Sequence, residues 1–411
     1  MPSDKSIGHR ALIANALGGG PAAVTLRSPG RDLLSTVGCL RTLGVEVETD
    51  AAHPDVSVQL AGQPRQPTAV LDCGNSGTTM RLLAGALAGR SIQATLDGDA
   101  SLRRRPMERV AEPLREMGAD VSTSDGRAPM RVTGRARLAA MEHRLPVASA
   151  QLVGAVAFGA LGADGETRIV SPGPTRDHTE RLLSAMGVAI RREGNVTTLR
   201  GPAVPRPLSL DVPGDPSAAA AWLVAATIHP DAEIELVDVA LNPTRLALVG
   251  ALREMGGDID LAPRDTDSPE PRGDIRVRSA SRLRALRIEG PRVAELIDEL
   301  PLLAIAMAST DGSSELRGAP ELRVKESDRI AATVAGLASI GAAVEELPDG
   351  WRASRGAPQE GEIPTHGDHR IAIAFAVAAL AGVATRVWLD DPACASVSYP
   401  SFWDDLRTVS A

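Results

Sequence analysis

Residues 367–382 read GDHRIAIAFAVAALAG, a polar start followed by an apolar run with no charged residue. A helix that is apolar on every side is stable only when it is buried all round. Five other segments have the same form: residues 3–17, 74–88, 149–162, 214–227 and 297–309. The sequence therefore predicts six buried helices. A polar residue stands near each start as a candidate N-cap: Asp4, Asn75, Ser149, Asp215, Asp298 and Asp368.

A second pattern follows the first five of these segments. It is an amphipathic stretch that ends at glycine and continues with alternating apolar residues, as in LRTLGVEVE at 40–48. Glycine after the last apolar residue indicates a helix C-terminus, and the alternation indicates a half-buried strand. The corresponding glycines are Gly44, Gly118, Gly187, Gly256 and Gly341. Residues 401–409 predict a sixth such helix, but no strand pattern follows it.

These patterns predict a repeating unit of strand, buried helix, strand, amphipathic helix and hairpin. Six units indicate two domains of three, which places the fold in the α/β (α+β) class. The Pro-rich residues 200–215 are the expected hinge. We expect an N-terminal domain at 5–211 and a C-terminal domain at 212–411 that also takes residues 1–4. A repeat scaffold without chemistry is the alternative, but structural caps do not require the Lys, Arg, His and Gln at these helix starts.

Composition excludes several functional classes. The net charge of −8 disfavours a general nucleic-acid binder, and 2% aromatic residues disfavour a base-stacking surface. Three widely separated cysteines form no disulfide framework and no zinc motif, so we expect a cytoplasmic protein without a metal. The longest apolar stretch, residues 371–384, is shorter than the roughly 18 residues of a membrane span.

Basic residues at the starts of two buried segments are candidate anion ligands. Lys5, Ser6 and Arg10 open the first segment, where cations oppose the helix dipole unless an anion binds there. The loop 74–78 suits a backbone site for a phosphate or carboxylate, although a plain tight turn fits equally. Arg103–Arg105 form a basic run. For these basic residues the alternative is a solvated surface.

Two further charged motifs lie in the second half of the chain. In residues 323–329, Lys325 and Arg329 are four residues apart, which predicts one shared helix face, with surface salt bridges as the alternative. His369 and Arg370 stand at the mouth of an apolar helix, where they are costly unless they face a polar cleft. No nucleotide-hydrolysis, dinucleotide or catalytic-triad motif occurs. The remaining prediction is a cleft for a small substrate, or two, with several negative charges.

Together these motifs resemble the 5-enolpyruvylshikimate-3-phosphate (EPSP) synthase family of enolpyruvyl transferases, in order and over nearly the whole chain. RVKESDRI at 323–330 and GDHR at 367–370 are the most specific. The others are DKSIGHRAL at 4–12, GNSGTTMRLLAG at 74–85, RRRPMERV at 103–110, SAQLVGA at 149–155, TRDHTERLL at 175–183, GDPSAAA at 214–220, IDELPLLAIA at 297–306 and SVSYPSFWDDL at 396–406. The resemblance implies the two-domain enolpyruvyl transferase fold, an inside-out α/β barrel with three βαβαββ units per domain and the active site in the cleft between the domains.

The resemblance also implies the reaction. The enolpyruvyl group of phosphoenolpyruvate passes to the 5-hydroxyl of shikimate 3-phosphate and phosphate leaves, in the shikimate pathway of aromatic amino acid biosynthesis. The residues implied for shikimate 3-phosphate are Lys5, Ser6, Arg10, Ser149, Ala150 through its backbone, Gln151, Arg176 and Lys325. Those implied for phosphoenolpyruvate are Lys5, Gly77, Arg105, Arg329 and Arg370, with His369 lining the same site.

The reaction needs a base and an acid. The 5-hydroxyl loses a proton as it attacks C2 of phosphoenolpyruvate, and C3 gains one. By resemblance Asp298 is the base and Glu326 the acid, with Lys5 a contender for either proton. The resemblance implies no metal or organic cofactor, and a monomer that uses two small substrates and neither nucleic acid nor a membrane. It also implies a target of the inhibitor glyphosate.

Two departures from the family pattern stand out. Val397 replaces a lysine found in some relatives, and Lys5 comes almost at the start, where relatives usually have about 20 residues before it. We expect either an upstream start or an unpaired strand edge in the sixth repeat.

Two alternative functions stay open. The UDP-N-acetylglucosamine enolpyruvyl transferase family differs in its Lys-Asn motif and loop cysteine. A catalytically inactive anion-binding scaffold would lack one carboxylate.

Overall fold

The computed structural model describes residues 1–50 and 55–410, which form two compact units. Unit 2 comprises Ser3–Val212 together with Ser268–Glu270, and unit 1 comprises Met1–Pro2, Pro213–Asp267 and Pro271–Ala411. Ser3, Asp4 and Val212 thus group with unit 2, whereas the sequence-based division assigns residues 1–4 and 212 to the C-terminal domain. The excursion of Ser268–Glu270 into unit 2 has no signal in the sequence pattern.

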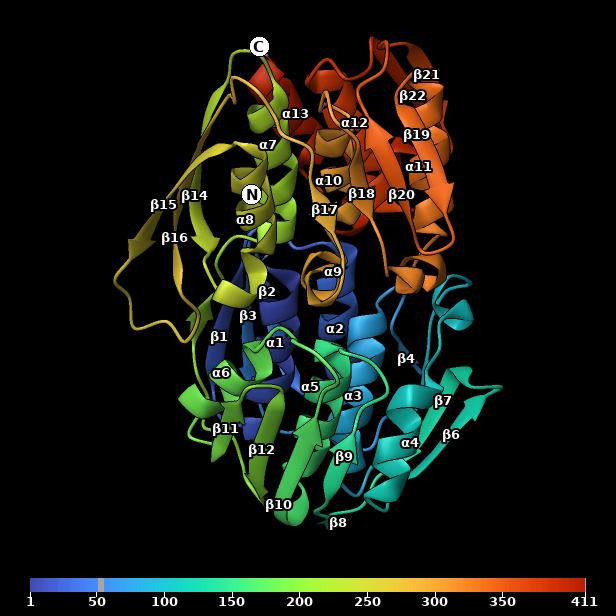
Figure 1. Cartoon of the computed structure of the whole chain (residues 1–411). Coiled ribbons are helices and arrows are strands. Elements are labelled where there is room, and N and C mark those ends of the chain that lie inside the picture. The colour runs from blue at the N-terminus through green and yellow to red at the C-terminus, as the bar shows by residue number, and fades with distance from the viewer. Residues whose placement is uncertain (51–54, 411) are drawn as a thin grey trace. The chain divides into compact units, whose positions relative to one another are not determined.

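Unit 2 surrounds three buried helices with three sheets (Figure 1). The buried helices are α1 (Lys5–Gly18), α3 (Gly77–Ala88) and α5 (Ala150–Ala160). Helix α3 packs on both α1 and α5, as expected for helices that are largely apolar on every side. Contact between α3 and α5 is so close that a Cβ on Gly85 would lie 2.0 Å from the carbonyl oxygen of Ala155. The amphipathic helices of this unit are α2 (Arg31–Thr42), α4 (Glu108–Glu116) and α6 (His178–Ala185).

The three sheets of unit 2 follow one plan. The strand after each buried helix pairs in parallel with a short strand and antiparallel with a hairpin. The first sheet is β13 (Leu210–Asp211), β1 (Ala22–Leu26), β3 (Val56–Ala61) and β2 (Glu46–Asp50). The second is β4 (Leu71–Asp72), β5 (Gln93–Asp97), β7 (Arg127–Thr133) and β6 (Asp120–Ser124). The third is β11 (Ile190–Glu193), β12 (Val196–Gly201), β10 (Ala163–Val170) and β8 (Leu138–Ala139), with β9 (Glu142–Arg144) also on β10.

Unit 1 repeats the plan around α7 (Pro216–Ile228), α10 (Leu300–Met307) and α12 (His369–Leu380), which pack on one another. Its sheets are β14 (Glu233–Ala240), β16 (Arg272–Arg278) and β15 (Asp258–Arg264); β17 (Arg287–Ile288), β18 (Ser314–Leu316), β20 (Gly350–Ser354) and β19 (Ala343–Leu347); and β21 (Glu360–Ile363) with β22 (Arg386–Leu389). The outer helices are α8 (Ala247–Met255), α9 (Pro291–Leu296), α11 (Arg329–Ser339) and α13 (Phe402–Ser410). Among the described residues β22 has no antiparallel hairpin, as expected for the sixth repeat.

The predicted helix ends are confirmed and the predicted starts only in part. All five glycines after the amphipathic helices have a positive φ, between 72° and 109°, which ends a helix with no Cβ penalty. Asp4, Asp215 and Asp368 cap their helices with side-chain oxygens, and Ser76 does so in place of Asn75. Ser149 stands at the cap position of α5 as predicted, but its side chain forms no cap hydrogen bond. The predicted residue is wrong for α3, as just described, and for α10, where Asp298 lies one residue before Glu299 at the cap position.

The predicted helix face shared by Lys325 and Arg329 is also wrong. Residues Pro320–Val324 form a short 3-10 turn and Lys325 is extended, whereas α11 begins at Arg329 after the cap residue Asp328. The Asp328 carboxylate accepts the amide of Ala331, which fixes the helix start four residues later than the charge spacing indicates. In the described part of the chain, no helix is both long and apolar enough to cross a lipid bilayer.

Candidate active site

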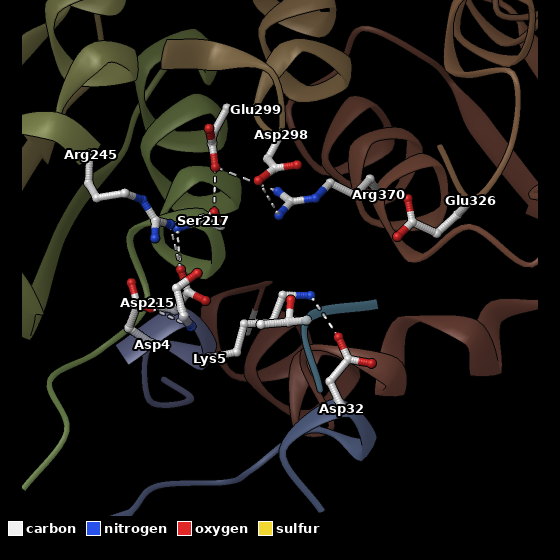
Figure 2. A network of polar contacts seen from close by, with 12 residues as sticks. Asp4, Lys5, Asp32, Asp215, Ser217, Arg245, Asp298, Glu299, Glu326 and Arg370 are labelled. Atoms are coloured by element: carbon white, nitrogen blue, oxygen red, sulfur yellow. Dashed lines mark hydrogen bonds and ion pairs between the residues drawn. The ribbon is translucent and has the colours of Figure 1, made fainter. Parts of the chain in front are cut away.

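The start of α1 in unit 2 presents Lys5, Ser6 and Arg10 as predicted. Lys5 Nζ lies 3.1 Å from Asp32 Oδ2, and Figure 2 shows this ion pair. Asp32 stands in the first turn of α2 and its side chain is 11% exposed, so the lysine balances a largely buried carboxylate. Sequence analysis missed Asp32, because no motif or spacing links residues 5 and 32.

Arg10 joins three helices of unit 2. Its Nε donates to Thr179 Oγ1 on α6 at 2.7 Å, its Nη1 to the Ser6 carbonyl at 2.9 Å, and its Nη2 to the Ala150 carbonyl at 2.9 Å. Burial lowers the pKa of Arg10 to about 10, and the nearby carboxylates of Glu180 and Asp4 oppose that effect. The guanidinium therefore stays charged at neutral pH, held at a fixed place by three acceptors.

Gln151 and Gly77 meet at the start of α3 through Arg81, which the sequence analysis did not single out. Arg81 Nη1 donates to Gln151 Oε1 at 2.6 Å, and Gln151 Nε2 donates to Thr78 Oγ1 at 3.0 Å. Arg105 donates to Asn75 Oδ1 at 2.7 Å. A Cβ on Gly77 would lie 2.7 Å from Arg81 Nη1 and 3.3 Å from Arg105 Nη1. The absence of a side chain at residue 77 thus lets two guanidinium groups approach the loop.

The remaining predicted residues of unit 2 lie next to these groups. Ser149 precedes Ala150 at the start of α5, and the Ala150 carbonyl receives Arg10. Arg176 stands just before α6, and its charge contributes to the lowered pKa of Arg10. Unit 2 therefore gathers its predicted ligands at the starts of α1, α3, α5 and α6, where helix dipoles also favour anions.

In unit 1, Arg329 is the centre of the second group. Its side chain is 2% exposed. Nε lies 2.8 Å from Asp368 Oδ2, Nη2 lies 2.7 Å from Glu326 Oε2, and Nη1 lies 3.8 Å from Asp298 Oδ1. Burial alone lowers the pKa of Arg329, but the carboxylates of Asp368, Glu326 and Asp298 outweigh it and raise the pKa. The predicted base and the predicted acid thus share one buried cation.

Arg370 and Lys325 complete the group in unit 1. Arg370 Nη2 lies 3.9 Å from Asp298 Oδ2, as Figure 2 shows, and Arg370 Nη1 lies 3.6 Å from Glu299 Oε1. Burial lowers the pKa of Lys325, an effect that Asp298 and Glu326 partly offset. His369 is buried at the start of α12, and its charge helps to lower the pKa of Asp368. All six predicted residues of unit 1 therefore fall in one cluster.

Glu299 anchors a polar network behind this cluster. Ser217 Oγ donates to Glu299 Oε1, Arg245 Nη2 donates to Ser217 Oγ at 2.7 Å, and the same nitrogen lies 3.0 Å from Asp215 Oδ1 (Figure 2). The side chains of Arg245 and Glu299 are 2% and 8% exposed. The sequence signal was adjacency alone, because Glu299 follows Asp298 in the motif IDELPLLAIA. The motif GDHR likewise contains Asp368, whose cap of α12 was predicted but whose hydrogen bond with Arg329 was not.

Known proteins are similar to this chain over its whole length. The family described as EPSP synthase (3-phosphoshikimate 1-carboxyvinyltransferase) matches residues 1–406. A protein of Roseiflexus castenholzii named 3-phosphoshikimate 1-carboxyvinyltransferase is 48% identical, with 100% of this chain and 96% of that protein covered. One of the same name from Herpetosiphon aurantiacus is 45% identical with the same coverage.

Solved structures support the fold. EPSP synthase from Acinetobacter baumannii matches with a TM-score of 0.86 and 36% identity, over 100% of this chain and 94% of that one. The enolpyruvyl transferase NikO from Streptomyces tendae matches with a TM-score of 0.77 over the same shares, and its 18% identity bears on the fold alone. The enolpyruvyl transferase fold expected from the sequence motifs is confirmed, and the chain belongs to the EPSP synthase family.

Proposed function

We propose that the two groups of polar side chains perform the reaction of this family in the roles given below. The enzyme transfers the enolpyruvyl group of phosphoenolpyruvate to the 5-hydroxyl of shikimate 3-phosphate and releases phosphate, a step of the shikimate pathway. The observation that supports the roles most directly is the cluster of Asp298, Glu326, Arg329 and Arg370 in unit 1. It combines two carboxylates for proton transfer with two cations for an anionic substrate.

Asp298 is the proposed base for the 5-hydroxyl. Its two oxygens lie 3.8 Å from Arg329 and 3.9 Å from Arg370, and nearby cations favour the charged carboxylate. The charged carboxylate is the form that can accept the hydroxyl proton as oxygen attacks C2 of phosphoenolpyruvate.

Glu326 is the proposed group at C3. Its hydrogen bond with Arg329 favours the carboxylate form in the free enzyme. When Arg329 binds phosphoenolpyruvate, it stabilises the carboxylate form of Glu326 less. Glu326 can then take up a proton and deliver it to C3. A tetrahedral intermediate results. Phosphate then leaves with the proton that Asp298 returns to it, as Glu326 takes a proton back from the C3 methyl group. Lys5 remains a second candidate for either proton.

The substrate ligands are proposed by motif and placement. The proposed ligands of shikimate 3-phosphate are Lys5, Ser6, Arg10, Ser149, Gln151, Arg176 and Lys325. Those of phosphoenolpyruvate are Lys5, Gly77, Arg105, Arg329 and Arg370, with His369 beside them. For Ala150 the Arg10 contact engages the carbonyl, so its proposed part is to hold that guanidinium. We also propose a monomer, and a reducing, cytoplasmic setting because Cys39, Cys73 and Cys394 are free thiols.

A coupled phosphate assay tests the function. Phosphate release is expected only when both substrates are present, with one phosphate per enolpyruvyl ether formed. Release from phosphoenolpyruvate alone would contradict the proposal, and so would no release with both substrates present.

Shikimate 3-phosphate is expected to compact the protein, because its proposed ligands come from both units. Arg10 and Arg176 belong to unit 2 and Lys325 belongs to unit 1, so the proposed ligands of this one anion include cations of both units. Small-angle X-ray scattering at saturating ligand should show a smaller radius of gyration. An unchanged radius would mean that one unit binds this substrate by itself.

Replacing Lys5 with methionine is expected to raise the dissociation constants of both substrates by about tenfold or more, because one cation contacts two anions. The chain has two lysines, Lys5 and Lys325, so the Lys5→Met variant leaves a single lysine side chain. Isothermal titration measures both affinities. The matched control is Arg31→Met, an exposed cation at the start of α2. Unchanged affinity for shikimate 3-phosphate would remove Lys5 from the site.

Gly77→Ala is expected to raise the inhibition constant for glyphosate more than the Michaelis constant for phosphoenolpyruvate. The new methyl group would meet Arg81 Nη1 at 2.7 Å and Arg105 Nη1 at 3.3 Å, which displaces guanidinium groups and narrows the pocket. The longer inhibitor is expected to lose more binding affinity than the shorter substrate. Gly38→Ala is the control, because a Cβ there meets nothing within 4 Å. Equal inhibition constants would show that residue 77 does not border the inhibitor.

A further inference from the structure

The hairpin of β15 and β16 belongs to unit 1, but three residues of its loop do not. Ser268–Glu270 group with unit 2, whereas Asp267 and Pro271 on either side belong to unit 1. Just after them the chain rejoins its own sheet, where Leu241 donates its amide to the Pro271 carbonyl at 2.7 Å. The loop thus makes a short, defined excursion that ends at Glu270.

Glu270 is buried in unit 2 against a histidine. The residue is 1% exposed, and its Oε1 lies 2.7 Å from Nδ1 of His178, which is also 1% exposed. An ionised carboxylate only accepts hydrogen bonds, so Nδ1 carries the proton that joins them. A carboxylate at this depth is costly unless it is paired, and an exposed hairpin loop has no need of one.

The pair lies at the start of α6, next to the proposed ligands of shikimate 3-phosphate. His178 is the first residue of α6, Thr179 is the second, and Arg176 stands two residues before His178. Thr179 Oγ1 accepts the hydrogen bond of Arg10 Nε. Glu270 is also near enough to Arg10 that its charge opposes the lowering of the Arg10 pKa by burial. Whatever fixes His178 therefore also fixes the acceptor that orients Arg10.

We propose that Glu270 is a positioning residue for shikimate 3-phosphate, and that through it the β15–β16 hairpin of unit 1 responds to occupation of the unit 2 site. Glu270 holds His178, the start of α6 holds Arg10, and Arg10 holds the substrate. The inference rests on the proposed roles of Arg10 and Arg176. No feature of the family motifs used for the function includes Glu270.

The decisive variant is Glu270→Gln, which keeps the shape of the side chain and removes its charge. The dissociation constant and KM for shikimate 3-phosphate are expected to rise about tenfold or more, the range for a hydrogen bond to a charged group. The KM for phosphoenolpyruvate, at saturating shikimate 3-phosphate, should stay within about twofold. Asp267→Asn, an exposed acid of the same loop, is the matched control and should leave both constants unchanged.

His178→Asn removes the other side of the pair and covers the case in which Glu270→Gln fails to fold. It should raise the same constant, and the double variant should be no worse than the poorer single variant, because the two act as one pair. Additive losses, or a fall in melting temperature without any change in shikimate 3-phosphate binding, would reduce the pair to a structural contact and overturn the proposal.

Hydrogen exchange tests the response of the hairpin. Addition of shikimate 3-phosphate should slow amide exchange in residues 258–278 of the wild type and of Asp267→Asn, but not of Glu270→Gln. Equal slowing in all three would refute the coupling. Arg10→Met separates this inference from the proposed function. If Arg10→Met does not weaken the binding of shikimate 3-phosphate, the proposed site is wrong. If Arg10→Met weakens this binding and Glu270→Gln does not, only the role of Glu270 is wrong.

Discussion

Replacing Asp298 with asparagine is expected to lower kcat by at least about 100-fold, with much smaller effects on substrate binding. Asparagine keeps the volume and the hydrogen-bond geometry but cannot accept the 5-hydroxyl proton. In the structure the Asp298 carboxylate lies 3.8 Å from Arg329 and 3.9 Å from Arg370. Nearby cations favour a charged carboxylate, which is the form that the proposed base requires.

Glu326→Gln should show a loss of similar size, because no carboxylate would remain to protonate and deprotonate C3. Stopped-flow single-turnover measurements separate chemistry from release, and titration of each substrate gives the binding constants. Asp311→Asn, an exposed acid in unit 1, is the control. If either active-site variant kept near-normal kcat, its assigned role would pass to another group, of which Lys5 is the first candidate.

Sequence periodicity could predict the fold because each unit is held together by local patterns. The Ala-rich runs indicate buried helices directly, and the glycines at the ends of the amphipathic helices have the left-handed φ that the pattern required. Caps were less predictable. The side chain of Ser149 does not cap α5, and Asp298 contacts Arg329 and Arg370 instead of capping α10. A single sequence gives no sign of which role a polar residue at a helix start takes.

Residues of the candidate site could be predicted only where they lie within a recognisable motif. Asp298, Glu326, Arg329 and Arg370 fall together as the motifs imply. Their supporting partners are distant in sequence and follow no periodicity. Asp32 pairs with Lys5 across 27 residues and Glu270 pairs with His178 across 92. Such partners are fixed by tertiary packing, so neither helix period nor strand alternation encodes them.

Asp368 is the most important of these supporting partners. It is fully buried and accepts from Arg329 Nε at 2.8 Å, from Ser327 Oγ at 2.9 Å and, as the cap of α12, from the Arg370 amide at 2.9 Å. One carboxylate therefore orients two proposed ligands of phosphoenolpyruvate. Burial alone raises the pKa of Asp368, but the charge of Arg329 outweighs it and leaves the pKa below its usual value.

Asp368→Asn is expected to lower the free energy of unfolding by about 3 kcal/mol, because it leaves Arg329 buried with less compensating charge. The estimate lies at the low end for a broken buried pair, since Glu326 still contacts Arg329 and asparagine can still cap α12. Ser327→Ala, which removes one neutral donor to the same carboxylate, should cost only about 1 kcal/mol. Urea unfolding at pH 7 measures both values, and a loss below about 1 kcal/mol for Asp368→Asn would contradict the proposed electrostatic role.

The same substitution should change the acid limb of stability. A carboxyl group whose folded pKa is depressed stabilises the protein fully above its unfolded pKa of 3.8, and that contribution disappears as pH falls through the lower folded pKa. The wild type should therefore lose stability from Asp368 below about pH 4, whereas Asp368→Asn lacks this contribution at every pH. The difference in unfolding free energy between the two proteins should accordingly be constant from pH 7 to about pH 5 and shrink in stronger acid. A difference that stayed constant down to pH 2 would mean that Asp368 does not titrate with folding, and the charge of Arg329 would then be balanced by Glu326 and Asp298 instead.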